Sequence, residues 1–117
     1  MWFFPETDIA NGWSTPVGNG TEVWFQVDFG TKTRISSAEL AFFANEEQNF
    51  DVPGSYRVQV VNGNSSSWVD VDGARYDGVV ANGMTGVEWY EVESGKARLV
   101  FTPKVGKKVR LVEFKLF

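Results

Sequence analysis

The stretch Val23-Trp24-Phe25-Gln26-Val27-Asp28-Phe29 sets a pattern that much of the chain repeats. Apolar side chains occupy every second position, and Gln26 and Asp28 lie between them. Successive side chains of a β-strand point to opposite faces, so a period of two is typical of a strand with one buried face. Trp24 is the exception, because this aromatic side chain falls on the polar side of the strand.

The same alternation returns in later segments, and we expect further strands near residues 38–42, 56–60, 68–71, 87–92, 97–102 and 109–117. Asn-Gly, Asp-Gly and Pro-Gly pairs separate them, and these residues suit tight connections between strands. No stretch keeps a period of 3.6 residues, so we expect little helix. The pattern predicts an all-β fold, an antiparallel β-sandwich of the jelly-roll type.

The length and composition indicate a single domain, residues 1–117, whose role is to bind a ligand. Five Trp and ten Phe exceed what a core of this size needs, so we expect some aromatic side chains at the surface, where they usually mark binding sites. A net charge of −4 argues against nucleic acid and against an anionic membrane as partners. The basic residues cluster beside one turn, and we interpret them as a solvated hairpin: Lys104, Lys107, Lys108 and Arg110.

The missing residue types argue against an enzyme. The chain has no Cys and no His, which excludes disulfides, thiolate metal sites and the usual Ser-His-Asp and Cys-His catalysis. A glycosidase needs two carboxylates across a cleft, whereas Glu46, Glu47 and Asp51 crowd one polar loop and are interpreted as solvated. We therefore predict a non-catalytic domain that requires no cofactor.

Two segments outside the alternating pattern are the candidate binding regions. Residues 44–54 form a long polar loop with a single aromatic side chain, and residues 1–21 are rich in aromatics. Flat rings stack on the apolar face of a sugar while amides and carboxylates hold its hydroxyls. The predicted ligand-binding residues, all expected in loops, are Trp2, Phe3, Phe4, Glu46, Glu47, Asn49 and Phe50. Each ring could instead pack as a lid over one end of the sandwich, which is the interpretation we favour for Trp13.

Glu113 is the candidate metal ligand. It has the same parity as Leu111, which places a carboxylate on a largely apolar face of the last strand. A buried carboxylate must be paired, protonated or metal-bound, and Ca²⁺ prefers such oxygen ligands. The alternatives are a partner such as Arg110 or Arg98, or a bulge that turns Glu113 outward, since Phe114 has the opposite parity.

Several segments, taken in order, resemble discoidin domains, also called coagulation factor V/VIII type C domains. Trp24-Phe25-Gln26-Val27-Asp28-Phe29-Gly30 resembles the pattern W-x-x-V-D-L/F-G of that family. Pro53-Gly54-Ser55-Tyr56-Arg57-Val58-Gln59, Trp68-Val69-Asp70-Val71 and Val109-Arg110-Leu111-Val112-Glu113-Phe114 resemble later segments of it. The resemblance implies a galactose-binding-like jelly roll of about eight strands with ligand contacts in loops at one end.

The opening Trp2-Phe3-Phe4-Pro5-Glu6 and Asn11-Gly12-Trp13 resemble a subgroup of modules appended to sugar-cleaving enzymes. This resemblance implies a carbohydrate-binding accessory module that is secreted or periplasmic and joined to a catalytic domain. It also implies a structural calcium near the closing-strand carboxylate, here Glu113. The A-x-D-G segment of the family is not present before the aromatic run, so we expect one calcium ligand and a leading strand to be absent. An edge left open in this way is a candidate surface for dimerisation.

Two other functions remain open from the sequence. Discoidin-like domains also act as adhesion modules that bind proteins or phospholipid head groups through exposed hydrophobic loop residues. A structural spacer packed on a catalytic domain would bury the surplus aromatics in that interface instead.

Overall fold

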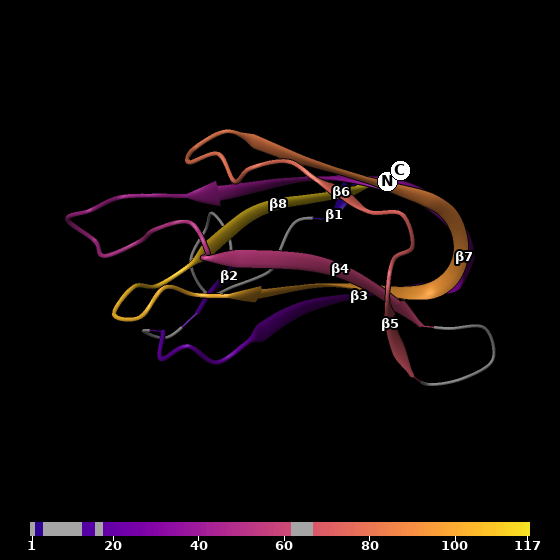
Figure 1. Cartoon of the computed structure of the whole chain (residues 1–117), viewed down its shortest axis with the longest axis horizontal. Helices are drawn as coiled ribbons and strands as arrows, with labels where there is room; N and C mark the ends of the chain where they lie inside the picture. Colours follow the sequence, from indigo (N-terminus) through magenta and orange to yellow (C-terminus); the bar gives the residue numbers. More distant parts are fainter. Residues whose placement is uncertain (1, 4–12, 16–17, 62–66) are drawn as a thin grey trace.

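A computed structural model describes residues 2–3, 13–15, 18–61 and 67–117 of the chain (Figure 1). These residues form strands and turns, and none of them belongs to a helix that could cross a membrane. The strands are β1 (Trp2–Phe3), β2 (Trp13–Ser14), β3 (Val23–Phe43), β4 (Ser55–Val61), β5 (Trp68–Asp70), β6 (Arg75–Tyr76), β7 (Met84–Thr102) and β8 (Arg110–Leu116). Every pairing between these strands is antiparallel, which confirms the predicted all-β class.

Two long strands, β3 and β7, run through both layers of the fold. They pair with each other along most of their length, with a register shift between Asp28 and Thr33. The first half of β3 and the second half of β7 join β4 and β5, and we call this layer the β4–β5 sheet. The other halves join β6 and β8, with β1 and β2 on the outer edge of β8, and we call this layer the β6–β8 sheet.

The chain turns from one layer to the other at a defined corner of β3. Gly30 has φ 76°, a left-handed conformation that other residues rarely adopt, and its N–H donates to Asp28 Oδ1 at 2.9 Å. Figure 1 shows β7 making the matching bend at the right of the view. The two bent strands stack the sheets face to face, which is the predicted sandwich.

The core lies between the two sheets. Phe25 of the β4–β5 sheet meets Phe114 of the β6–β8 sheet edge to face, with ring centres 6.3 Å apart. Phe42 and Phe101 form a second such pair at 5.9 Å. Both geometries are favourable for aromatic rings. The buried cluster around them is Val27, Ile35, Ala38, Leu40, Val58, Val60, Val71, Val87, Trp89, Ala97, Leu99, Val109, Leu111 and Leu116.

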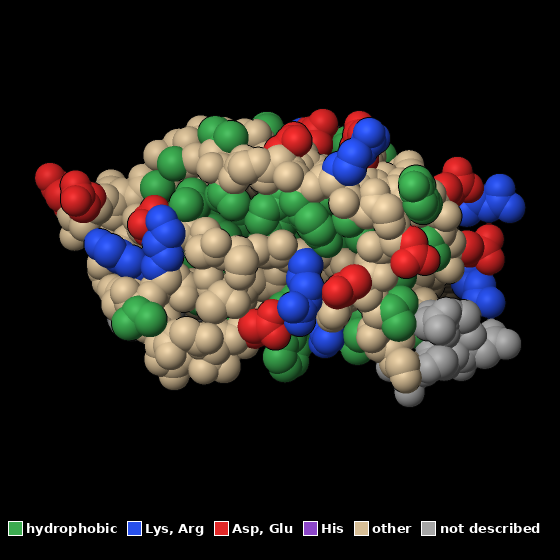
Figure 2. All heavy atoms as spheres, in the orientation of Figure 1, with side chains coloured by type: hydrophobic (Ala, Val, Ile, Leu, Met, Phe, Trp, Pro, Cys, Tyr) green, Lys and Arg blue, Asp and Glu red, His purple; other side chains and the backbone are tan. Residues whose placement is uncertain are grey.

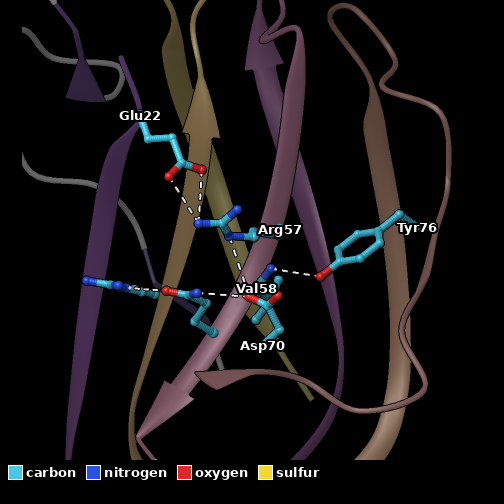
Figure 3. A network of polar contacts seen from close by, with 7 residues as sticks. Glu22, Arg57, Val58, Asp70 and Tyr76 are labelled. Atoms are coloured by element: carbon cyan, nitrogen blue, oxygen red, sulfur yellow. Dashed lines mark hydrogen bonds and ion pairs between the residues drawn. The ribbon is translucent and has the colours of Figure 1, made fainter. Parts of the chain in front are cut away.

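Two tyrosines, Tyr56 and Tyr76, form hydrogen bonds between the open edges of the two sheets. The backbone N–H of Val58 in β4 donates to the hydroxyl of Tyr76 in β6 at 3.0 Å, as Figure 3 shows. The hydroxyl of Tyr56 donates to the carbonyl of Asp77 at 2.8 Å, and the two tyrosine rings lie 5.1 Å apart. Figure 2 shows a band of hydrophobic side chains along this seam, between β4 and the chain that connects β6 to β7.

Candidate functional site

The polar loop predicted at residues 44–54 is a closed turn at one end of the sandwich. Asn45 and Phe50 exchange two backbone hydrogen bonds, each 2.9 Å long. A further bond of 3.1 Å from the N–H of Asn49 to the carbonyl of Glu46 closes the tip. Glu46 and Glu47 are therefore held on the tip, and both are exposed to solvent.

Asn49 fixes this loop to the neighbouring turn at residues 103–109. Its φ is 64°, which Asn tolerates better than most residues. Its side-chain amide donates to the carbonyl of Gly106 at 2.8 Å, and its carbonyl accepts from the N–H of Lys108 at 3.0 Å. The side chain that we predicted to hold a ligand thus serves to join two loops.

The ring of Phe50 is half-buried among three side chains. It meets Phe43 edge to face with ring centres 5.7 Å apart. Lys108 Nζ lies 4.5 Å from its centre, and the Arg110 guanidinium lies 5.1 Å from it. Cations over a ring are stabilised by its negative face, so much of the ring is already engaged within the protein.

Beside this ring is a hollow of about 280 Å³, lined by Ala44, Asn45, Glu46, Phe50, Asp51 and Lys107. We call it the loop hollow. It brings two carboxylates, an amide and an ammonium group to the edge of an aromatic ring. Two of the predicted ligand residues, Glu46 and Phe50, meet here.

Asp51 on the wall of the loop hollow is held in its charged form. Burial acts to raise its pKa, but hydrogen bonds from the Val52 N–H and from Lys104, with the charges of Lys104 and Lys107, lower the pKa below its usual value. Lys104 Nζ lies 3.2 Å from its Oδ2 atom. The carboxylate therefore accepts hydrogen bonds and stays ionised at neutral pH.

The aromatic residues of the chain start lie elsewhere. Trp2 and Phe3 were expected in a loop, and this expectation is wrong, because they form β1 and pair with Lys115 and Phe114. Those partners lie near the far end of β8 from the segment that contacts Phe50. Strand pairing at the open side of β8 has outweighed the loop-like composition. Phe4 lies outside the described residues.

Glu113 follows a bulge in β8, as one of our alternatives expected. Ala41 pairs with Glu113 and Phe42 pairs with Leu111, so Val112 is an extra residue of β8 between these two pairs. The Glu113 side chain is 30% exposed, and its Oε2 atom lies 3.8 Å from Lys115 Nζ. Among the described residues no group of three or more acidic side chains gathers to hold a metal ion. The ammonium group of Lys115 is therefore the partner of this carboxylate, and calcium binding by Glu113 stays a prediction.

The sequence matches no protein-family model and no curated protein, but the fold matches several solved structures. A chain of the β-galactosidase BgaA from Streptococcus pneumoniae matches with a TM-score of 0.70 and 19% identity, covering 97% of this chain and 76% of that one. Chitosan-binding module 1 of a chitosanase/glucanase from Paenibacillus sp. IK-5 matches at 0.67 and 20%, covering 89% and 73%. The fold is a jelly roll.

A GH29 fucosidase of Ruminococcus gnavus contains the same jelly roll as a small part of a longer chain. The TM-score is 0.62 at 18% identity, over 91% of this chain but only 19% of the fucosidase. At these identities the likeness establishes the fold alone.

The jelly roll also presents a group of side chains that our sequence analysis did not assemble. On the outer face of the β4–β5 sheet, strand register aligns Gln26, Arg98, Gln59 and Asp70 across four strands. Trp24 projects beside them and is 53% exposed. Its place on the polar side of an alternating strand was the signal in the sequence.

Arg98 is the centre of this group. Its guanidinium lies 5.3 Å from the centre of the Trp24 ring and 4.5 Å from that of the Trp68 ring. Its Nε donates to Gln59 Oε1 at 2.8 Å, and Gln59 Nε2 donates to Asp70 Oδ1 at 2.8 Å. We call Trp24, Arg98 and Trp68 the indole–arginine cluster.

Proposed function

We propose that the chain is a non-catalytic carbohydrate-binding module of the discoidin type. It serves a secreted or periplasmic enzyme that cleaves glycans and is joined to it in one protein. The observation that carries the proposal is the shared fold with a chitosan-binding module, supported by the likeness to parts of a β-galactosidase and a fucosidase.

The loop hollow is the proposed sugar site. The carboxylate of Glu46 can accept hydrogen bonds from sugar hydroxyls, and Lys107 and Asn45 can donate hydrogen bonds to them. The edge of the Phe50 ring supplies an apolar contact. A sugar ring presents hydroxyls around an apolar face, so it can use all of these groups together. The hollow is small and lies at an exposed loop tip, so we expect weak binding, from about micromolar to millimolar dissociation constants.

The charge state of Asp51 supports binding rather than hydrolysis at this site. A general acid in a glycosidase needs a raised pKa so that it carries a proton at neutral pH. The pKa of Asp51 is lowered instead, and its carboxylate is engaged by Lys104. The other carboxylate of the hollow belongs to Glu46, which is exposed on the tip.

Titration calorimetry of the whole chain against galactose, glucosamine and their oligomers tests the proposal. We expect Glu46→Gln to weaken the binding of the best sugar about tenfold, the effect of one lost charged hydrogen bond. Glu47→Gln is the matched control, because Glu47 is exposed on the same tip but does not line the hollow. Absence of any sugar binding, or equal losses in both variants, would contradict the proposal.

A spacer role is the second candidate. Val80, between β6 and β7, is 46% exposed, and Met84, the first residue of β7, is 41% exposed. Exposed apolar side chains that lie together favour contact with another domain. Gel filtration distinguishes this role, because it predicts self-association of the isolated chain that Val80→Ser and Met84→Ser abolish.

A further inference from the structure

We propose that the outer face of the β4–β5 sheet is a second binding surface, for an uncharged polysaccharide chain that lies across the indole–arginine cluster. The inference shares the ligand class of the proposed function, but it uses none of the residues of the loop hollow.

The strand pattern directs this group of side chains outward. Val58, Leu99 and Val27 of the same sheet are buried in the core. Their sequence neighbours on the opposite face include Gln59, Arg98 and Gln26, which the register places in one row. Neighbouring strands lie about 4.8 Å apart, so a row across four strands spans a length suited to a chain rather than to a single sugar.

Hydrogen bonds and ion pairs hold this face in one arrangement. Arg57 Nη2 lies 3.0 Å from both carboxylate oxygens of Glu22, and Arg57 Nε lies 3.5 Å from Asp70 Oδ1. Figure 3 shows Arg57 between these two acids. Asp70 continues the network to Gln59 and so to Arg98. A ligand that binds here does not have to order these side chains, which reduces the entropy cost of binding.

The balance of charge on the face indicates an uncharged partner. Two guanidinium groups, Arg57 and Arg98, are matched by two carboxylates, Glu22 and Asp70. An anionic polymer would be attracted by the two guanidinium groups and repelled by the two carboxylates, and a cationic polymer would experience the reverse. A neutral chain of sugars avoids that repulsion and still meets hydrogen-bonding groups of both kinds.

The exposed groups have the chemistry that sugar chains require. The half-exposed Trp24 indole offers flat apolar surface for the C–H face of a sugar ring. Within the described part of the chain, only the Nε of Arg98 has a hydrogen-bond partner, so its terminal nitrogens are available as donors. The carboxylates of Glu22 and Asp70 are half-exposed or more, and they are available as acceptors.

Affinity gel electrophoresis of the whole chain tests this inference, with hydroxyethylcellulose, galactomannan and arabinoxylan as neutral polymers in the gel. We expect at least one polymer to retard the protein and Trp24→Ala to weaken this retention about tenfold. Tyr90→Ala is the matched control, since Tyr90 is 73% exposed but lies on the half of β7 in the other sheet. The melting temperature of each variant confirms folding, and Trp24→Phe supplies a milder change if Trp24→Ala is unstable.

The outcomes separate this inference from the proposed function. Retention that Trp24→Ala abolishes and Glu46→Gln leaves intact supports a second surface. Retention that Trp24→Ala does not change, or that Tyr90→Ala reduces equally, overturns the inference even if small sugars still bind at the loop hollow. Retention only on a charged polymer such as heparin or chitosan also overturns it. If no sugar or polymer binds by any method, both proposals fail.

Discussion

The guanidinium group of Arg98 lies 4.5 Å from the centre of the Trp68 ring, although the two residues come from strands that do not pair with each other. Arg98 is on β7, Trp68 is on β5, and β4 lies between them. The long arginine side chain crosses β4 and covers part of an indole that would otherwise meet water. This contact joins the edge strand β5 to the centre of its sheet.

A double-mutant cycle should detect this contact. We expect Arg98→Ala and Trp68→Ala to show a coupling energy of about 0.5–1 kcal/mol in urea unfolding, the usual range for a partly exposed cation over an aromatic ring. Arg98→Ala combined with Tyr90→Ala should be additive, because Tyr90 lies on the other sheet. Additivity in the first cycle would show that the stacking contributes nothing to stability.

Removing a core ring should be far more costly than removing a terminal one. Phe114 is fully buried against Phe25, and we expect Phe114→Ala to lower the free energy of unfolding by about 3–5 kcal/mol. Phe117 is 48% exposed, so Phe117→Ala should change it by less than about 0.5 kcal/mol. Denaturant titrations followed by tryptophan fluorescence measure both. Similar losses would contradict the packing of β8 described above.

Gly18 allows the turn beside the loop hollow to close. A Cβ atom at this position would lie 2.7 Å from the carbonyl oxygen of Lys104 and 2.7 Å from Pro103 Cβ. We expect Gly18→Ala to cost about 1–3 kcal/mol and to weaken sugar binding, because Lys107 sits on the same turn. Gly54→Ala is the control, as its nearest neighbour would be 3.6 Å away. Thermal melts and calorimetry compare the two, and equal stability would contradict the close approach.

The seam between the sheets should weaken at alkaline pH. Burial, and then the charges of Asp77 and Tyr76, raise the pKa of Tyr56 from 10.0 to about 12. The folded state therefore keeps a proton that the unfolded chain has lost, so stability falls as the pH rises from about 10 to about 12. Tyr56→Phe loses the hydrogen bond to Asp77, and at about pH 8 it should be less stable than the wild type by about 1 kcal/mol.

The Tyr56→Phe variant also tests whether ionisation of the Tyr56 hydroxyl causes the loss of stability at alkaline pH. Tyr56→Phe has no hydroxyl to ionise, so the difference in urea midpoint between it and the wild type should shrink between about pH 8 and about pH 11. A difference that stays constant would show that Tyr56 titrates alike in the folded and unfolded chain. Absorbance at long ultraviolet wavelength follows the ionisation directly in the folded protein.

Alternation in the sequence predicted the fold well because it reports burial directly. Val27 and Phe29 face inward or partly inward while Gln26 and Asp28 are exposed, as the period of two required. The strands expected separately near 23–29 and 38–42 proved to be one strand, β3. Pairing with β7 continues on both sides of the corner at Gly30, and the local pattern does not reveal this long-range pairing.

The two proposed binding surfaces were harder to predict than the fold, because the side chains of the larger one are brought together by the register between distant strands. Trp24 was recognisable by its parity alone, but its meeting with Arg98 is fixed by the pairing of β3 with β7, which no short window contains. Asn49 was expected to hold a ligand, whereas its left-handed backbone and its bond to Gly106 give it a structural task. The polar composition predicted the loop correctly, but it could not distinguish a ligand-binding role for Asn49 from a structural role.

Nuclear magnetic resonance titration of the ¹⁵N-labelled chain, with the best sugar from calorimetry, would show residue by residue whether sugar binds at the loop hollow. We predict saturable shifts in the backbone signals of Asn45, Glu46, Phe50 and Lys107, which line or border the hollow. Those shifts should be absent in Glu46→Gln at the same sugar concentration. A spectrum that does not change, or changes confined to residues outside the hollow, would show that the loop hollow is not a sugar site.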